Sequence, residues 1–447
     1  MAQKSNGRIR PYEANPFYWQ YRDKPVVLLG GSVEDNLFQV PDIVEQLDTL
    51  AACGGNYVRC TMSSRDAGNV WPFDRDPATG LYDLERPGEE YWRCFDLFLD
   101  LTAQRDIILQ IELWDRFDFA RSPWQENPYN PKNNVNYTAE ESRLAEQIDT
   151  HPGQNESRFF YTVPALENNE LVLRYQQSQV NEMLRRSLPR PNVLYCMDNE
   201  TCGDPEWGKY WSEYIQAAAG EAGVEAHTTE MWDPHDIQQP QHEHTWKHPE
   251  TYSFCDISQN NHSPATRHWD NMQWLRQQVA DSGNIRPINT VKIYGANPGR
   301  WGTSRDGQER FWRNIIGGLA ATRFHRPPSG LGLSETAQAH IRSMRMLLAE
   351  FDILSCEPRN DLLHWRSMTE AYCTAEPGVA YAVFFPDGGN LHVDIEGLPG
   401  GRKIYVHWLD IPASAWQPIQ EVPPGSNRAH LVTPRESGYW AALVKVL

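Results

Sequence analysis

The sequence predicts an α/β protein, a (β/α)8 barrel followed by a small antiparallel β-sandwich. Short apolar runs alternate with longer amphipathic stretches through most of the 447 residues, which is typical of repeated βα units. Eight such runs occur before residue 356, and beyond it only short apolar runs separated by Gly, Pro and Asp remain. We therefore expect a barrel with an N-terminal strand extension over residues 1–355 and a sandwich over residues 356–447.

The expected barrel elements follow from apolar runs and from apolar residues at helical spacing. The eight strands are predicted at 25–31, 56–60, 107–114, 193–200, 224–230, 252–257, 287–294 and 320–325. The helices are predicted at 40–53, 91–103, 171–187, 210–222, 269–279, 311–319 and 333–354. The sandwich strands are predicted at 381–385, 391–395, 403–409 and 441–447.

Composition excludes several classes of function. The formal charge of −18 argues against nucleic acid and against an anionic membrane surface, since both need clustered Lys and Arg. The sequence has no run of 18 apolar residues, so no membrane span is expected. The eight cysteines show no metal-like spacing, which predicts reduced thiols without zinc. The pattern implies no cofactor, and it leaves the oligomeric state open.

The N-terminal residues have no apolar segment, so no signal peptide is expected. The location of the protein therefore stays open between the cytoplasm and an exported form.

Aromatic residues point toward carbohydrate. There are 17 Trp, 19 Tyr and 15 Phe, and many stand among amides and prolines, as in the segment from Trp124 to Tyr129. An aromatic ring covers the C–H face of a sugar while neighbouring polar groups bond its hydroxyls. The long loop at 115–162, which holds that segment, is therefore expected to be functional.

Barrel enzymes work at the carboxyl ends of their strands, so the residues there are the candidates for chemistry. Glu200 ends the fourth predicted strand beside Asn199 and is the best candidate for a general acid/base. Glycoside cleavage needs a second catalytic group. Glu230 is predicted for this role, and the other interpretation is that Glu230 is a structural partner of Arg59. Lys292 completes the predicted catalytic set. Predicted substrate contacts are Arg59, Trp114, Asp115, Asn199, Trp232, Asn260, His262, Tyr294 and Arg323.

Other polar groups have simpler interpretations. The carboxylates of Glu34, Asp35 and Glu112 are expected mainly to hold arginines in the barrel mouth. His227, His235, His242, His244 and His248 are expected to belong to a solvated loop, because their spacing is not that of a metal site. No Gly-x-Ser-x-Gly elbow is present, which argues against a serine esterase.

The chain resembles clan A glycoside hydrolases, and within them the bacterial apiosidase-like family with its C-terminal collagen-binding type of β-domain. The resemblance spans nearly the whole chain. Its motifs are NPFYWQYRDKP at 15–25, LLGG at 28–31, Arg59, NNVNY at 133–137, YCMDNE at 195–200 and AALV at 441–444. It implies that Glu200 is the acid/base and that Asn199 bonds a substrate hydroxyl.

One departure from that clan concerns the seventh strand. The resemblance implies a nucleophilic Glu at its end, but Lys292 stands there, and a lysine cannot form the glycosyl ester. Beside Glu200 and Glu230, a charged Lys292 is expected to lower the pKa of a carboxyl, which favours a nucleophile or base over an acid.

The expected function is a glycoside hydrolase acting on a plant or algal oligo- or polysaccharide. Two alternatives stay open. One is a polysaccharide lyase on a uronate-containing glycan, with Lys292 or Tyr294 as base. The other is a barrel that binds carbohydrate without cleaving it.

Overall fold

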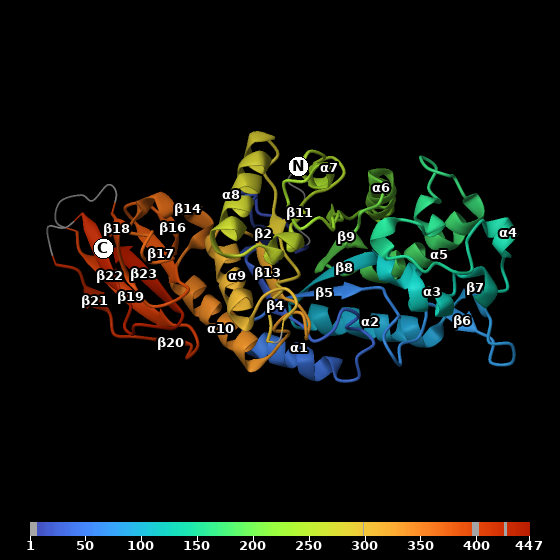
Figure 1. The fold of residues 1–447 in the computed structure, drawn as a ribbon, viewed down its shortest axis with the longest axis horizontal. Coiled ribbons are helices and arrows are strands. Elements are labelled where there is room, and N and C mark those ends of the chain that lie inside the picture. Colours follow the sequence, from blue (N-terminus) through green and yellow to red (C-terminus); the bar gives the residue numbers. More distant parts are fainter. Residues whose placement is uncertain (1–6, 298, 396–401, 424–426) are drawn as a thin grey trace.

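The computed structural model describes residues 7–297, 299–395, 402–423 and 427–447. Residues 1–6, on which the expectation about a signal peptide rests, lie outside this part. Within it, the predicted barrel is confirmed: eight parallel strands each precede one main helix (Figure 1). The strands are β4 (Leu28–Gly31), β5 (Tyr57–Thr61), β8 (Ile108–Asp115), β9 (Val193–Asn199), β10 (Thr228–Thr229), β11 (Cys255–Asp256), β12 (Ile288–Asn289) and β13 (Ala321–Phe324).

The helices that follow these strands form the outer layer. They are α1 (Ile43–Ala52), α2 (Glu89–Gln104), α5 (Glu170–Ser187), α6 (Pro205–Glu221), α7 (Pro240–Trp246), α8 (Ala265–Asp281), α9 (Ser304–Ile316) and α10 (Glu335–Glu350). Seven of these were predicted, and α7 was not. Its sequence, PQHEHTW, has too few apolar residues to show a helical stripe.

The ring of strands closes with help from side chains. Six strands pair in the order β10-β9-β8-β5-β4-β13, and β11 pairs with β12. Backbone bonds from Ala320 N to Ile288 O and from Thr290 N to Ala321 O join β12 to β13. Between β10 and β11, the hydroxyls of Ser253 and Thr229 accept backbone N–H groups, each at 3.1 Å. Because hydroxyls replace ladder bonds there, and the Ser258 hydroxyl likewise accepts from Val291 N just after β12, strands five to seven are shorter than predicted.

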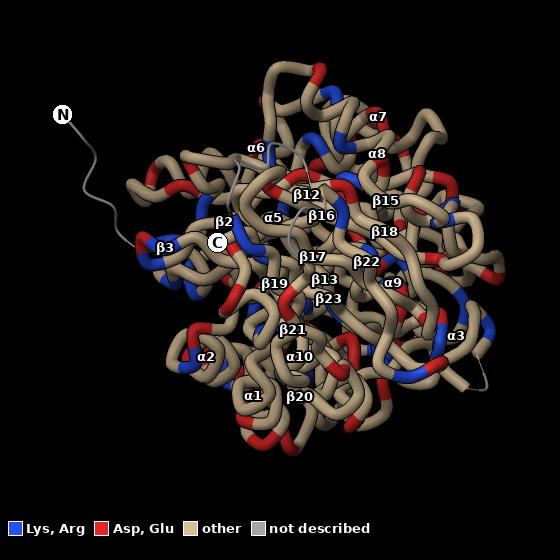
Figure 2. The backbone as a smooth tube through the Cα atoms, turned by 90° about the vertical axis from the view of Figure 1, so that its left-hand side faces the viewer, with Lys and Arg blue, Asp and Glu red and all other residues tan. Residues whose placement is uncertain are grey.

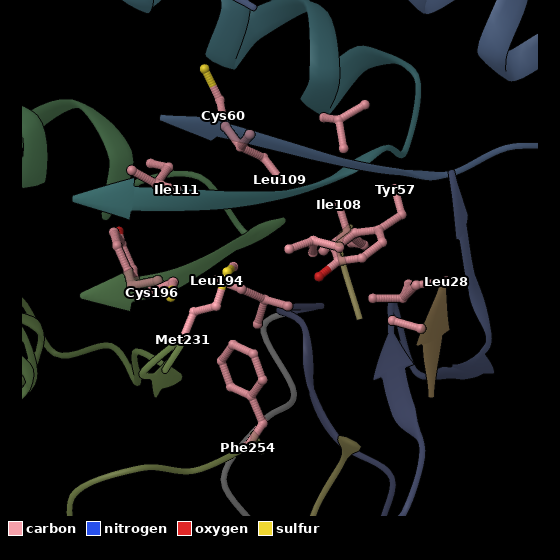
Figure 3. Packing of buried hydrophobic residues seen from close by; sticks show 14 of the residues in the cluster. Leu28, Tyr57, Cys60, Ile108, Leu109, Ile111, Leu194, Cys196, Met231 and Phe254 are labelled. Atoms are coloured by element: carbon pink, nitrogen blue, oxygen red, sulfur yellow. The ribbon is translucent and has the colours of Figure 1, made fainter. Parts of the chain in front are cut away.

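The barrel interior is packed with apolar side chains from many of the strands. Figure 3 shows Leu28, Ile108, Leu194 and Phe254 meeting inside the sheet, and all four are fully buried. An N-terminal sheet of β1 (Arg10–Pro11), β2 (Trp19–Tyr21) and β3 (Lys24–Val26) contacts the base of β12. Its Trp19 indole donates to Asn289 Oδ1 at 2.8 Å and packs on Phe254. Trp19 therefore covers the base of the barrel interior.

The long loop after β8 folds into short helical turns. These are η1 (Arg116–Phe119), α3 (Arg121–Glu126), η2 (Pro131–Asn133), α4 (Ala139–Ser142), η3 (Pro152–Gln154) and η4 (Arg158–Tyr161). Trp124 and Tyr129 are fully buried in it, and the Trp124 indole donates to Ala145 O. The expectation that these two rings face a sugar is therefore wrong, because they form the loop's own core. A hairpin of β6 (Phe73–Arg75) and β7 (Tyr82–Pro87) lies before α2.

Beyond residue 356 the chain forms two antiparallel sheets. The larger contains β14 (Glu357–Pro358), β16 (Tyr372–Glu376), β17 (Ala380–Phe385), β19 (Ile404–Asp410), β20 (Ala415–Trp416), β21 (Gln420–Glu421) and β23 (Trp440–Val446). The smaller contains β15 (Leu363–His364), β18 (Asn390–Asp394) and β22 (Arg428–Val432). A shared cluster including Leu391, Trp408 and Val444 is buried in this part of the chain. β16 and β22 escaped prediction because polar residues interrupt them.

The larger C-terminal sheet packs on the barrel. Phe384 stacks on Trp312 of α9 at 5.4 Å, and Leu409 and Leu443 belong to the barrel's own apolar core. Figure 1 accordingly places these strands beside α8, α9 and α10. The C-terminal sheets and the barrel are therefore joined by a continuous apolar contact.

Surface charge and cysteines agree with the composition. In the view of Figure 2, Lys and Arg segments lie among Asp and Glu segments and form no basic face. All eight cysteines are free thiols, as predicted. No helix in the described ranges has both the length and the apolar character needed to cross a membrane.

Candidate active site

A cavity of about 460 Å³ opens at the carboxyl ends of the barrel strands. It is lined by Asp35, Arg65, Phe117, His151, Asn199, Glu200, Asp233, His235, Gln259, His262, Lys292, Tyr294, Arg300, Trp301, His325, Arg326 and Ser329. Of the twelve residues predicted for the site, the structure brings five to this cavity: Asn199, Glu200, His262, Lys292 and Tyr294.

Glu200 reaches the cavity because β9 bulges at its end. Cys196 pairs with Thr229, and the next pairing joins Thr201 to Trp232, so five residue steps on β9 face three on β10. The excess interrupts the pairing of β9 with β10 and leaves Glu200 beyond the last residue of the strand, while Asn199 still pairs with Asp115 of β8. Glu200 has a left-handed backbone (φ 54°), a conformation that costs a residue with a side chain roughly 1–2 kcal/mol. Such strain is typical of functional positions.

Two donors hold the Glu200 carboxylate. Tyr294 Oη donates to Glu200 Oε1 at 2.5 Å, and Lys292 Nζ lies 2.8 Å from the same oxygen. Lys292 also donates to Asn199 Oδ1, so its ammonium group bridges the Asn-Glu pair. The side chains of residues 199, 200, 292 and 294 therefore form one connected network.

The charge state of Glu200 follows from these contacts. Burial raises the pKa of Glu200, but the Lys292 charge and the hydrogen bonds from Lys292 and Tyr294 outweigh it and leave that pKa well below 4.5. Glu200 is therefore ionised at neutral pH in the free protein. In this state it is equipped to accept a proton and not to donate one.

An arginine cluster surrounds Asp35. Arg59 lies 3.1 Å from Asp35 and 3.0 Å from Glu112, and Arg326 lies 2.6 Å from Asp35. Despite burial, Arg59, His325, Arg326 and Arg65 hold the pKa of Asp35 well below its usual range. Asp35 and Glu112 thus hold arginines in the barrel mouth, as the sequence predicted, and Arg59 is paired with them and not with Glu230.

Asp233 differs from the other two carboxyls of the cavity. Asp35 and Glu200 are both paired with Arg or Lys, whereas Asp233 has no such partner within the described residues. It accepts a hydrogen bond from the Cys202 thiol at 3.3 Å. Asp233 therefore stands in the cavity without a cation of the kind that neutralises Asp35 and Glu200.

Glu230 does not line the cavity, which corrects its predicted place beside Glu200. Its side chain is fully buried behind the β9 bulge, and Oε1 accepts the N–H groups of Asp198 and Met231, both at 2.9 Å. A Cβ on Gly208 of α6 would lie 2.2 Å from Oε2, so the helix approaches only because residue 208 is glycine. Glu230 therefore supports the bulge that presents Asn199 and Glu200.

We expect Glu230→Gln to keep stability within about 1 kcal/mol of the parent, because the amide oxygen still accepts both N–H groups. Glu230→Ala leaves those buried donors unpaired and opens a cavity, which costs about 2–5 kcal/mol. Urea denaturation measures both values. A catalytic Glu230 would instead make Glu230→Gln lose activity 10²–10⁴-fold, by about the usual contribution of acid–base catalysis, while the fold stays intact.

Six more predicted contacts lie away from the cavity, each for a structural reason. Trp114 packs against Trp207 and Trp211, and Trp232 donates to Thr245. Asp115 pairs with Arg65, and Asn260 donates to His268 O. Arg323 is fully buried and bonds Val291 O, and Arg59 is fully buried in its ion pairs. Strand-end position alone did not separate side chains that line the cavity from those that are held in buried contacts.

The histidine-rich segment is only partly a solvated loop. His227 and His242 are buried, and burial lowers the pKa of each to about 4. His242 Nε2 bonds Pro234 O at 2.8 Å, and His235 lies in the cavity. The solvated-loop prediction is therefore wrong for His227 and His242, whereas His235 is exposed in a loop at the cavity. Among the described residues, no group of three or more His, Cys, Asp or Glu side chains is arranged to hold a metal ion.

Several cavity residues were not predicted. Arg65, Phe117, His151, His235, Arg300, Trp301 and Ser329 line the cavity from loops. Loop residues follow no apolar periodicity, so most of these cavity residues could not have been predicted from the sequence. Arg300 and Trp301 are the exception, because a Gly- and Pro-rich loop directly after a barrel strand is where such enzymes place binding residues.

The sequence matches no family model and no curated protein. Solved structures do match the fold. A glycoside hydrolase family 5 structure from Bacteroides vulgatus superposes with a TM-score of 0.65 at 12% identity, covering 98% of this chain and 94% of that one. A family 5 mannosidase mutant from Rhizomucor miehei, in complex with mannosyl-fructose, gives 0.51 at 11% identity, covering 77% and 98%.

The chain shares the fold of glycoside hydrolase family 5. The first of these matches spans both the barrel and the C-terminal sheets. At these identities the likeness establishes architecture alone. The resemblance to the apiosidase-like family and to its collagen-binding type of domain stays a prediction, since no sequence match tests it.

Proposed function

We propose that this protein is a glycoside hydrolase that cleaves a glycosidic bond in a plant or algal oligo- or polysaccharide. The observation that most supports this is Glu200, which a strained bulge presents to a cavity at the carboxyl ends of the strands. Asn199, His262, Trp301 and Phe117 supply the amide and aromatic surfaces that suit a sugar.

Glu200 is the group that exchanges protons with the reacting centre, and it enters the reaction ionised. The second carboxyl is Asp233, in place of Glu230, because Asp233 lines the same cavity without an Arg or Lys partner among the described residues. Two carboxyls with different environments are the usual requirement of glycoside cleavage. The C-terminal sheets (356–447) act as a brace for the barrel (1–355), through the contact of Phe384 with Trp312.

The test is hydrolysis of a panel of aryl glycosides and plant and algal oligosaccharides. On any substrate that the parent cleaves, Glu200→Gln is expected to lower kcat/KM by about 10²–10⁴-fold. Glu221→Gln, an exposed change at the end of α6, serves as the matched control and is expected to change nothing. Sugar binding without cleavage across the panel would contradict the proposal and identify a silent binding barrel.

An eliminase is the second candidate, and the ionised Glu200 beside Lys292 favours it because elimination requires a base. The two reactions leave different products. Elimination from a uronate glycan gives an unsaturated sugar with ultraviolet absorbance, whereas hydrolysis adds water and gives none. Absorbance that increases in proportion to chain cleavage would replace the hydrolase with the lyase.

A further inference from the structure

We propose that Tyr294 is the nucleophile of the reaction and that Glu200 is the base that activates it. This inference rests on the proposed hydrolase function and adds the group that forms the covalent intermediate. An activated nucleophile is recognised by a base within hydrogen-bonding distance and by a third group that orients the base. Tyr294, Glu200 and Lys292 have this relationship.

The hydrogen bond runs in the direction that activation requires. Tyr294 Oη donates to Glu200 Oε1 at 2.5 Å, so the phenol proton already points at the base. Lys292 Nζ, 2.8 Å from the same oxygen, keeps the carboxylate anionic and fixed. Lys292 itself is bound by Asn199 Oδ1 and Glu200 Oε1, so its nitrogen acts as a donor and is not free to attack.

The tyrosine ring is held in place before any ligand binds. It stacks on the His262 ring at 4.2 Å and meets the His325 ring edge-on at 4.9 Å. Arg310 donates to the Tyr294 carbonyl at 2.8 Å and so fixes the backbone. With its ring locked and its side chain at the cavity wall, Tyr294 presents a single oxygen to the ligand.

The chemistry of the site explains why a tyrosine takes this role. The strand-seven position at which the resemblance implies a carboxylate holds Lys292, two residues before Tyr294. Tyrosine acts as nucleophile in one class of glycosidases, the sialidases, so the reaction has a chemical precedent. Burial and the neighbouring Glu200 carboxylate raise the pKa of Tyr294, so the phenol stays protonated until it attacks.

The first step forms the bond from Tyr294 Oη to the anomeric carbon and breaks the bond from that carbon to the leaving oxygen. The phenol proton passes to Glu200, and Asp233 relays a proton from solvent to the leaving oxygen, which departs as an alcohol. In the second step water attacks the anomeric carbon, and Asp233 relays the proton of that water back to solvent. The bond to Oη breaks, and Glu200 returns its proton to Tyr294. The net change is the addition of one water molecule.

The experiment first identifies an aryl glycoside that the parent protein hydrolyses. A 2-deoxy-2-fluoro glycoside of the same sugar with a dinitrophenyl leaving group is then used as the probe, since it slows breakdown of a covalent intermediate. Intact-protein mass spectrometry is expected to show one added sugar, and peptide mapping is expected to place it on Tyr294. Tyr294→Phe is expected to take up no sugar and to lose kcat at least about 10²-fold on the parent substrate.

Two further readouts keep the outcome decisive. Tyr214→Phe on α6 is the matched control and is expected to label and to hydrolyse as the parent does. Tyr294→Phe must melt within a few degrees of the parent, and the product formed by the parent must retain its anomeric configuration. The proposal is overturned by a sugar on a carboxylate, by inversion, or by a folded Tyr294→Phe with kcat within tenfold of the parent. Absence of hydrolysis by the parent would instead refute the proposed function.

Discussion

Replacing Lys292 with methionine is expected to lower kcat/KM about 100-fold near neutral pH and to shift the acid limb of the pH profile to higher pH. Burial pulls the pKa of Glu200 upward, and the Lys292 charge is the main influence that pulls it down. Methionine keeps the length of the side chain but removes the charge, so burial then dominates. Glu200 becomes protonated and no longer accepts the Tyr294 proton.

The direction of the pH effect follows from which form of Glu200 is active. In the parent the ionised form persists down to a pH below 4.5, so the acid limb lies below that value. In Lys292→Met the ionised form appears only above 4.5, so kcat/KM recovers as the pH rises. Profiles measured from about pH 4 to 9 on one substrate compare the two proteins.

Lys292→Arg is the matched variant, because it keeps the positive charge beside Glu200. We expect it to retain the low acid limb and to lose less than tenfold in kcat/KM. A gain of activity in Lys292→Met would contradict the assignment, since it would show that Glu200 works as a proton donor. An unchanged acid limb would show that Lys292 does not control the charge of Glu200.

The sequence predicted the barrel because its signal is repeated in every βα unit. The strands β5, β8 and β9 are buried along their whole length, and the helices α2 and α5 have clear apolar stripes, so they appear at nearly the predicted bounds. The apolar pattern is weaker at β10, β11 and β12, which pair with their neighbours through side-chain hydroxyls and a few backbone hydrogen bonds. Tertiary contacts, and not local preference, define those three strands.

The site was only partly predictable for a different reason. A residue at the end of a strand faces either the cavity or the surrounding layer, and alternation decides which. The β9 bulge breaks that alternation, bringing Glu200 to the cavity, while Glu230 lies behind the bulge. A bulge is defined by comparing one strand with its neighbour, so the two additional residues of β9 cannot be recognised from the sequence of β9 alone.

Replacing Arg59 with methionine is expected to reduce the free energy of unfolding by about 3–5 kcal/mol, because it leaves two buried carboxylates without their shared partner. Arg59 is fully buried and lies within 3.1 Å of both Asp35 and Glu112. Asp35 still has Arg65 and Arg326, so Glu112 bears most of the loss. Urea denaturation at fixed pH measures the difference, and Arg10→Met, at an exposed ion pair, is expected to change stability by less than about 1 kcal/mol.

The pH dependence of this loss identifies Glu112 as its source. Burial raises the pKa of Glu112 to about 7 even with Arg59 present, so the folded protein binds this proton more tightly than the unfolded chain, whose ordinary value is 4.5. A carboxyl with a raised pKa stabilises the fold below 4.5, and that stabilisation is lost as the pH rises toward 7. Without Arg59 the raised pKa of Glu112 moves higher, so the loss of stability continues above pH 7.

The Arg59→Met protein is therefore expected to lose more free energy of unfolding at pH 8 than at pH 5, and adding Glu112→Gln is expected to remove most of that difference. Equal destabilisation at both pH values would mean that the side chain acts through packing and not through its charge.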